Sequence, residues 1–136
     1  MGMDVFGRNP SEPCGQYFRA SIWMWPPIHE QMALRCSDLF SDELLRAMAW
    51  NEGAGPDDQE TCSIMAERFA QALTTHQDGF AVESNEVRVT ENGHLVNKEN
   101  LAQDPTLKTS SPFRASRGLV MDWIQFLRHC GGFEVW

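Results

Sequence analysis

The chain has 136 residues, of which 42% are hydrophobic, and its 19 acidic and 11 basic residues give a net charge of −8. This length fits one domain over residues 1–136, the hydrophobic content excludes a disordered chain, and the acidic balance opposes direct binding to nucleic acid, which depends on Lys and Arg. No apolar run approaches the ~20 residues that cross a bilayer, and the N-terminus lacks the basic and apolar regions of a secretory signal, so we expect a cytoplasmic protein without membrane contact.

The N-terminal quarter predicts a strand, a loop and a helix around a cluster of aromatic residues. Residues 3–6 form a short apolar segment before Asn9-Pro10, which predicts a strand that ends in a turn, and residues 11–16 predict a loop. Residues 17–25 are ambiguous, because their apolar side chains fit both helical spacing and strand alternation. Pro26-Pro27 suit the first turn of a helix, so we expect a short helix after the aromatic segment.

Two further helices are predicted in the middle of the chain. The first has Ser37 or Ser41 as its N-cap and a buried stripe of Leu44, Leu45, Met48 and Ala49. After a break rich in Gly, Asp57 as N-cap and Glu60 three residues later form an acidic variant of the capping box. The apolar face of this second helix consists of Cys62, Met65, Ala66, Phe69, Ala70 and Leu73.

A β-hairpin is predicted next. Asn92-Gly93 lies between two alternating segments, and both residues tolerate a positive φ. With a two-residue loop, Val89 lies opposite Val96, and Val87 shares their face. The polar residues 97–111 then predict a long, flexible surface connection.

The C-terminal part predicts a helix and a strand. The helix runs from Ser116 to Cys130 and ends at Gly131-Gly132, which supply the left-handed conformation of a C-cap. Residues 133–136 alternate like a short strand, and we expect this strand to pair with the one at the other end of the chain. The expected fold is therefore α+β, a single domain with three to four helices, one β-hairpin and short terminal strands.

The sequence assigns no metal, cofactor or catalytic group. The cysteines and histidines lack metal-ligand spacing, so we expect no metal site and no cofactor. Gly53 and Gly55 precede a helix that could receive an anion, but neighbouring acidic residues would repel phosphate, which favours a simple turn and helix cap. No Ser or Cys stands in a nucleophile elbow, and the candidate acids Asp4, Asp122 and Glu134 have no partner that the sequence identifies.

The best candidate binding site surrounds Arg19. This arginine, beside Trp23 and Trp25, could hold a carboxylate or phosphate between aromatic walls, and we include Asn51 and Arg128 in the same candidate site. In the structural alternative, the Arg19 guanidinium stacks on a tryptophan at the edge of the core.

Three separated blocks of the chain carry a resemblance to a known group of proteins. They are Met1 to Pro10 with Tyr17-Phe18-Arg19 and Trp23-Met24-Trp25, then Asn51 to Gly55 with the helix that follows, and finally Phe126-Leu127-Arg128 with Gly131-Gly132-Phe133-Glu134. In this order they resemble a family of small, uncharacterised bacterial and phage proteins, over about half of the chain. The resemblance implies a prokaryotic or phage source and no activity. Pro26 stands where that family usually has Arg, and the paired cysteines of some longer relatives are missing, so their zinc ribbon is not carried over.

Three functions are consistent with the sequence. The leading hypothesis is a non-enzymatic interaction protein that binds a partner protein through its acidic or aromatic surface. One version is an inhibitor of a host defence complex that mimics the charge of DNA, as an anti-CRISPR protein does, since the acidic residues between 38 and 60 are accompanied by a single Arg46. The alternative for these acidic residues is a surface that only keeps the protein soluble. The alternative is a small ligand-binding or enzymatic domain with an Arg/Trp-lined pocket. The third is a structural or accessory subunit that acts within an oligomer.

Overall fold

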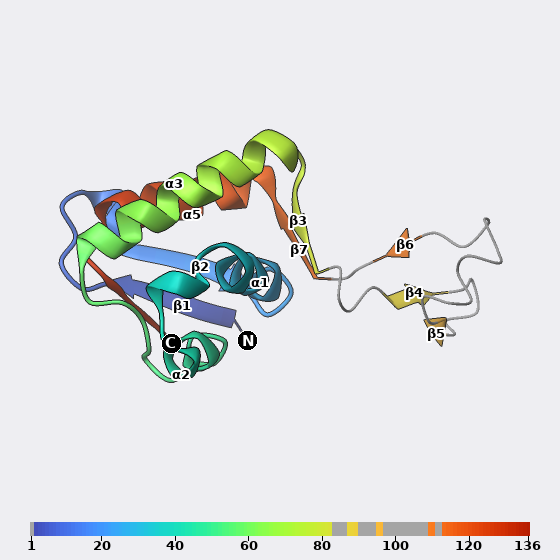
Figure 1. Cartoon of the computed structure of the whole chain (residues 1–136), viewed down its shortest axis with the longest axis horizontal. Helices are drawn as coiled ribbons and strands as arrows, with labels where there is room; N and C mark the ends of the chain where they lie inside the picture. The colour runs from blue at the N-terminus through green and yellow to red at the C-terminus, as the bar shows by residue number, and fades with distance from the viewer. Residues whose placement is uncertain (1, 83–86, 90–94, 97–108, 111–112) are drawn as a thin grey trace.

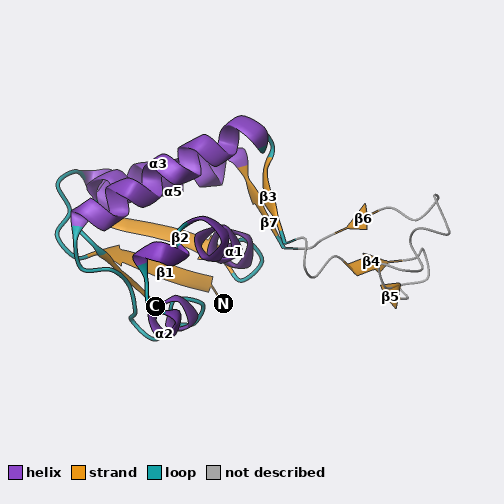
Figure 2. Cartoon of the chain, in the orientation of Figure 1, coloured by secondary structure: helices purple, strands orange, loops and turns teal. Residues whose placement is uncertain are grey.

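The computed structural model describes residues 2–82, 87–89, 95–96, 109–110 and 113–136 (Figure 1). Four α-helices and short antiparallel strands within these residues form the predicted α+β fold (Figure 2). In chain order the elements are β1 (Gly2–Gly7), η1 (Pro13–Gly15), β2 (Tyr17–Ser21), α1 (Trp25–Arg35), η2 (Ser37–Leu39), α2 (Asp42–Ala47), α3 (Gln59–Thr75), β3 (Gly79–Ala81), β4 (Val87–Val89), β5 (Leu95–Val96), β6 (Thr109–Ser110), β7 (Arg114–Ser116), α5 (Arg117–His129) and β8 (Phe133–Val135).

β1 is the central strand of an antiparallel sheet with the order β2-β1-β8, which we call the terminal sheet. Val5 pairs with Phe18 of β2 and with Val135 of β8, so the predicted pairing of the first and last strands is confirmed. Because side chains alternate along a strand, one face of this sheet is buried and the other is open. The buried face carries Met3, Val5, Phe18, Ala20, Phe133 and Val135.

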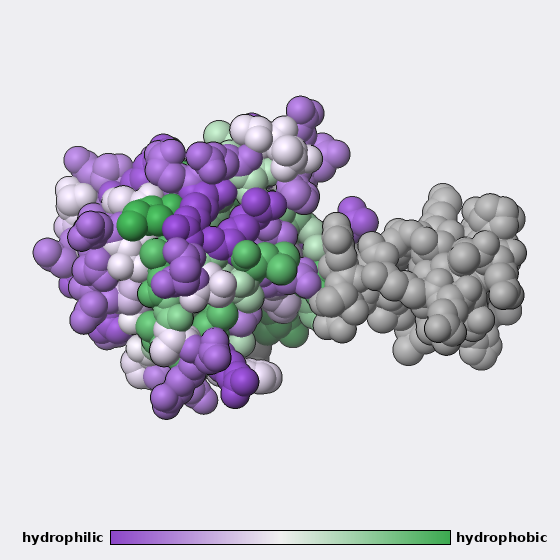
Figure 3. Space-filling model, in the orientation of Figure 1, coloured by the Kyte–Doolittle hydropathy of each residue, from purple (hydrophilic) through white to green (hydrophobic). Residues whose placement is uncertain are grey.

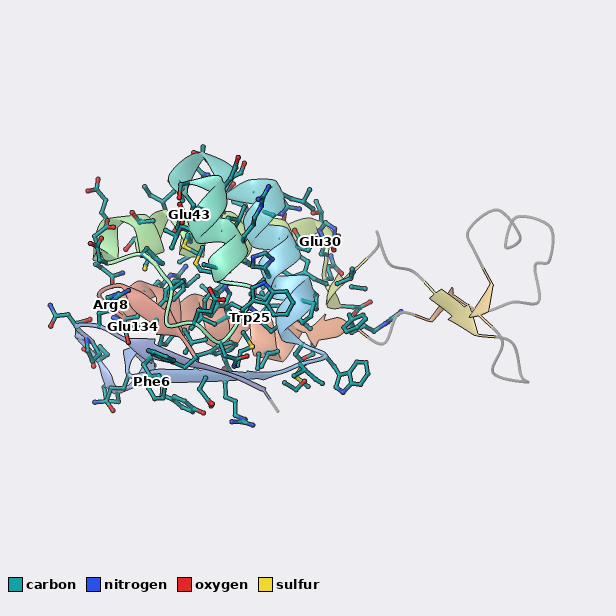
Figure 4. The ribbon with its side chains drawn as sticks, turned by 90° about the horizontal axis from the view of Figure 1, so that it is seen from below. Phe6, Arg8, Trp25, Glu30, Glu43 and Glu134 are labelled. Atoms are coloured by element: carbon teal, nitrogen blue, oxygen red, sulfur yellow. The ribbon has the colours of Figure 1, made fainter. Side chains whose placement is uncertain are left out.

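Helix α5 covers the buried face of the terminal sheet, and α3 packs against α5 (Figures 1 and 4). Trp123 of α5 lies at the centre of this core and is fully buried. Its ring centroid is 5.0 Å from that of Phe18, 5.4 Å from Trp25 and 5.4 Å from Phe133. Phe69 of α3 contacts the same ring at 6.2 Å. One side chain therefore joins β2, α1, α3 and β8.

The ambiguous aromatic segment forms two elements. Residues 17–21 are the strand β2, and α1 begins at Trp25 with Pro26-Pro27 in its first turn. Proline suits this position because the first turn of a helix leaves backbone N–H groups without intrahelical partners. The predicted loop over residues 11–16 contains the short 3-10 helix η1.

The helix caps follow the prediction with one correction. Ser41, one of the two candidates, caps α2, and α5 begins next to Ser116 as predicted, with Ser116 as its cap. The cap of α3 is Asp58 and not Asp57: its carboxylate accepts a hydrogen bond from the Thr61 backbone N–H at 2.8 Å. Asp58 has an extended backbone and α3 begins at the next residue, so Thr61 and not Glu60 stands three positions after the cap, and the predicted capping box is not formed.

The buried stripe of α3 agrees closely with the predicted one, whereas the stripe predicted for α2 is buried only at Met48. On α3, Ala72 is buried while the predicted Ala70 is only half-buried. On α2, Met48 is fully buried at the C-cap, whereas Leu44 and Leu45 are half-buried. α5 buries Val120, Trp123, Ile124, Phe126 and Leu127.

The predicted hairpin strands pair, with a different register. β4 and β5 are antiparallel, but Val89 pairs with Leu95 rather than with Val96. The predicted register assumed a two-residue loop, and the pairing observed is shifted by one residue from it. The turn residues Asn92-Gly93 lie outside the described residues. Within the predicted connection 97–111, Thr109–Ser110 form β6 and pair with β4, and the rest lies outside the described residues.

We predict that Trp123→Ala lowers the free energy of unfolding by about 3–5 kcal/mol, because it removes a fully buried ring that four elements share. Urea unfolding would measure the change. Met121→Ala on the same helix is the matched control, since Met121 is 49% exposed, and it should change the value by less than about 0.5 kcal/mol. Trp123→Phe should cost less than Trp123→Ala, because Phe leaves a smaller cavity and gives up no hydrogen bond, since the buried Trp123 Nε1 has no partner among the described residues. If Trp123→Ala and Met121→Ala lowered the free energy of unfolding equally, the central position of the Trp123 ring would be contradicted.

Candidate functional site

The open face of the terminal sheet is the strongest candidate site in the described structure. Alternation places every second side chain of the three strands on this face, opposite the helices. Figure 4 shows the labelled Phe6 pointing away from the helices. We define the outer face by Asp4, Phe6, Tyr17, Arg19, Glu134 and Trp136.

Strand register brings these six residues together in two rows. Asp4 lies between Arg19 of β2 and Trp136, whose backbone exchanges two 2.7 Å hydrogen bonds with Asp4. Phe6 lies between Tyr17 and Glu134 in the next row. The outer face is therefore assembled from both ends of the chain.

Three exposed aromatic rings are part of this face. Phe6 is 44% exposed, Tyr17 46% and Trp136 48%. The Phe6 and Tyr17 rings form a cross-strand pair with centroids 5.3 Å apart. Such pairs stabilise a sheet by roughly 0.2–1 kcal/mol, and the half of each ring that stays exposed leaves apolar area gathered on this face.

Charged groups on the outer face are paired with one another. The Asp4 carboxylate accepts hydrogen bonds from the Tyr17 hydroxyl and from Arg19 Nη1, the latter at 2.8 Å. Glu134 accepts a hydrogen bond from Trp136 Nε1 at 3.0 Å through its second carboxylate oxygen. Its first oxygen forms an ion pair with Arg8 at 2.7 Å, and Figure 4 shows these two side chains next to each other. These hydrogen bonds fix the side chains of Tyr17 and Trp136 against the two carboxylates.

The Asp4 carboxylate has a pKa below the usual value for aspartate. The hydrogen bond from the Tyr17 hydroxyl is the main cause, and the positive charge of Arg19 adds to it. The ionised form of Asp4 is therefore favoured in the folded protein. Ionised Asp4 therefore stabilises the folded state at neutral pH, and this stabilisation is lost as the pH falls through the lowered pKa.

The predicted site residues do not converge on one pocket. Arg19 is on the outer face, and its guanidinium lies against Gly2, whose carbonyl accepts a hydrogen bond from Asn51 at 3.1 Å. Trp25 is 2% exposed and donates a hydrogen bond from Nε1 to the Met48 carbonyl at 2.9 Å, which makes it a core residue.

The other two predicted residues lie on separate parts of the surface. Trp23 is 50% exposed and contacts the Phe113 ring at 5.3 Å. Arg128 of α5 lies 3.8 Å from Glu67 of α3. The Arg19 guanidinium forms an ion pair with the Asp4 carboxylate, whereas the alternative interpretation of the sequence expected it to stack on a tryptophan. Binding roles for Trp23, Asn51 and Arg128 stay predictions.

The sequence predicted one pocket lined by arginine and tryptophan, but in the structure these residues line two different hollows. One, of about 430 Å³, lies between β2 and α5 and contains Arg19 and Asp122. The other, of about 410 Å³, lies beside α1 and contains Trp25 and the exposed Trp50. Arginine and tryptophan thus do not meet in either hollow.

The residues missed by sequence reasoning are Phe6, Tyr17 and Trp136. Asp4 and Glu134 were candidate acids without a partner, and the register supplies their partners. The available signal was the alternation of residues 3–6 and 133–136, which marks one face of each strand. This alternation indicates a shared site only in combination with the pairing of β1 and β8, because the faces of two separate strands need not meet.

The glycines before α3 have a structural explanation. Gly53 has a φ of +79°, and the Trp136 indole lies directly against it. Gly55 lies against the backbone of Phe133 in β8. A side chain at position 53 would therefore collide with Trp136, and one at position 55 with Phe133. These contacts support the predicted turn.

Metal-ligating side chains do not cluster in the described part of the chain: no group of three or more His, Cys, Asp and Glu side chains there could hold a metal ion. Cys14 is exposed, and burial raises the pKa of the Cys36 thiol to about 11.

Comparisons with family models, with curated proteins and with solved structures find no match to this chain. The resemblance to bacterial and phage proteins therefore stays a prediction. None of the helices in the described segments combines the length and hydropathy needed to cross a bilayer.

We predict that Tyr17→Phe raises the pKa of Asp4 toward the usual value for aspartate, because the variant lacks the hydroxyl that donates to the carboxylate. Carbon-13 NMR of the carboxyl groups across a pH titration would measure it. Asp38 is the internal control, since Arg68 lowers its pKa independently of Tyr17, and its titration should be the same in both proteins. An unchanged Asp4 titration would show that Tyr17 does not hold the carboxylate.

Proposed function

We propose that this chain is a non-enzymatic interaction protein, of bacterial or phage origin, that binds a partner protein through the outer face. The single observation that carries the proposal is the group of three exposed aromatic rings, of which Tyr17 and Trp136 bond to the paired carboxylates and Phe6 packs on Tyr17. Tyr, Trp, Phe and Arg are the residue types enriched in the energetically dominant parts of protein interfaces.

The paired charges favour a protein ligand. Asp4 with Arg19, and Glu134 with Arg8, already neutralise each other. A partner that covers this face would bury ion pairs rather than lone charges, which reduces the desolvation cost of binding. The aromatic rings would supply apolar area at little cost in conformational entropy, because they are already ordered by cross-strand contacts.

Affinity capture from a prokaryotic host, followed by calorimetry with the captured protein, tests the proposal. We predict that Phe6→Ala and Tyr17→Ala each weaken binding by about 30-fold or more, as truncated hot-spot residues do. Leu34→Ala is the matched control, because Leu34 is an equally apolar side chain, 70% exposed, on α1 rather than on the sheet. Wild-type affinity in both sheet variants would exclude the outer face as the binding surface.

A second candidate is a mimic of nucleic-acid charge that inhibits a host defence complex, in the manner of an anti-CRISPR protein. It is favoured by exposed acidic residues on α2, at the start of α3 and between them: Asp42, Glu43, Glu52, Asp57 and Glu60. In the described part of the chain none of these forms an ion pair. Figure 3 shows a mainly hydrophilic surface in the orientation that presents α2 and α3. The ligand of such a surface would be a basic, nucleic-acid-binding protein.

Salt dependence distinguishes the two candidates. A charge mimic should lose about tenfold or more in affinity between 50 and 500 mM salt, because exposed charges are screened. The double variant Asp42→Lys, Glu43→Lys should reduce binding at low salt and flatten this dependence. Affinity that changes little with salt and is insensitive to the double variant would reject charge mimicry and leave the outer face as the binding surface.

A further inference from the structure

We propose that the free edge of β2 accepts an extended segment of the partner protein as a fourth strand, with a basic side chain of that segment beside Asp122. This inference rests on the proposed function, since it assumes that the terminal sheet is the surface that binds the partner. Addition of a strand to an exposed sheet edge is a common mode of peptide recognition.

The two edges of the terminal sheet differ. The β8 edge is covered by residues 53–56: the Gly53 N–H donates to the Val135 carbonyl at 2.7 Å, and the Val135 N–H donates to the Ala54 carbonyl at 2.8 Å. The Phe133 N–H donates to the Pro56 carbonyl at 2.9 Å. No strand within the described residues pairs with the opposite edge, which is formed by β2.

The hydrogen-bonding groups at the β2 edge follow from the register. Asp4 exchanges its backbone hydrogen bonds with Trp136, so the peptide groups of Met3 and Val5 are the ones that face β2. Their partners are Ala20 and Phe18. The N–H and C=O groups of Tyr17 and Arg19 therefore point outward, and in the described part of the chain no backbone group bonds to them.

A hollow of about 430 Å³ adjoins this edge. It lies between β2 and α5, and Leu119, Asp122 and Gln125 of α5 line it opposite Tyr17 and Arg19. Because side chains alternate along a strand, an added strand would place one set of side chains beside Tyr17 and Arg19 and the other set in the hollow.

The charge of the hollow favours a basic side chain. Asp122 is exposed and forms no ion pair with the described residues, whereas Arg19 is neutralised by Asp4. Asp122 therefore determines the sign of the local charge, and the chain as a whole carries −8. A Lys or Arg of the incoming strand would pair with Asp122 and would be attracted by the whole molecule.

The residues after β2 extend the contact surface. Ile22, Trp23 and Met24 are 42%, 50% and 40% exposed. A strand that runs past Ser21 would contact these apolar side chains. The expected ligand is therefore an extended segment with alternating basic and apolar residues.

Amide hydrogen exchange by NMR tests the edge directly, with the full chain and a synthetic eight-residue peptide of alternating Lys and Val. We predict that saturating peptide slows exchange of the Tyr17 and Arg19 amides about tenfold or more, while the Phe18 and Ala20 amides, already bonded to β1, are unchanged. An otherwise identical peptide of alternating Glu and Val should bind more weakly. A Lys-Val peptide that is N-methylated at alternate residues on its pairing edge should give no protection.

Two variants of equal charge change test the role of Asp122. Asp122→Asn should weaken binding of the Lys-Val peptide about fivefold, the effect of losing one exposed ion pair. Asp57→Asn, which removes the same charge before α3, should change the affinity by less than about twofold.

Unprotected Tyr17 and Arg19 amides at saturating peptide would overturn the proposal. Protection that depends on the concentration of the chain itself, without peptide, would assign the edge to a second copy and would also overturn it. The result is distinguishable from failure of the proposed function. If Phe6→Ala and Tyr17→Ala abolish partner binding but the peptide gives no protection, the outer face binds the partner without strand addition.

Discussion

The arrangement of the molecule depends on the position of β1 between β2 and β8. The central strand pairs with both neighbours at Val5, so residues at the two ends of the chain share one sheet. Alternation then divides the strands into two sets of side chains. One set belongs to the core, where Phe18 and Phe133 contact Trp123, and the other meets solvent as the outer face. Both the stability of the fold and the candidate site follow from this single pairing.

The two proposals for binding use different parts of the same molecule. The outer face offers aromatic rings whose neighbouring charges are paired, which suits short-range contact. The exposed acidic residues on and around α2 and at the start of α3 act over longer distances and are screened by salt. An acidic surface accelerates association with a basic partner, while desolvated aromatic contacts govern how slowly the complex dissociates. The two surfaces would therefore act on different steps of binding.

Local patterns predicted the elements better than they predicted the site. Period and capping residues identified α3 and α5, and Gly131-Gly132, with φ of +66° and +92°, end α5 as expected. The cap of α3 was misplaced by one residue because two adjacent aspartates satisfy the same local rule. The partner of Arg19 was not predictable, since the contact with Asp4 depends on strand register and not on spacing. The burial of Trp25 likewise depends on its packing against Trp123.

The unequal edges of the terminal sheet also limit how the protein can assemble. A sheet with two open edges can continue to add copies and grow into a fibre. Here residues 53–56 occupy the β8 edge, so growth of the terminal sheet in that direction is blocked. Addition of a strand at β2, from a partner or from a second copy, would leave the terminal sheet of this chain without a second open edge. The turn at Gly53 would therefore limit assembly through this sheet to one added strand per chain.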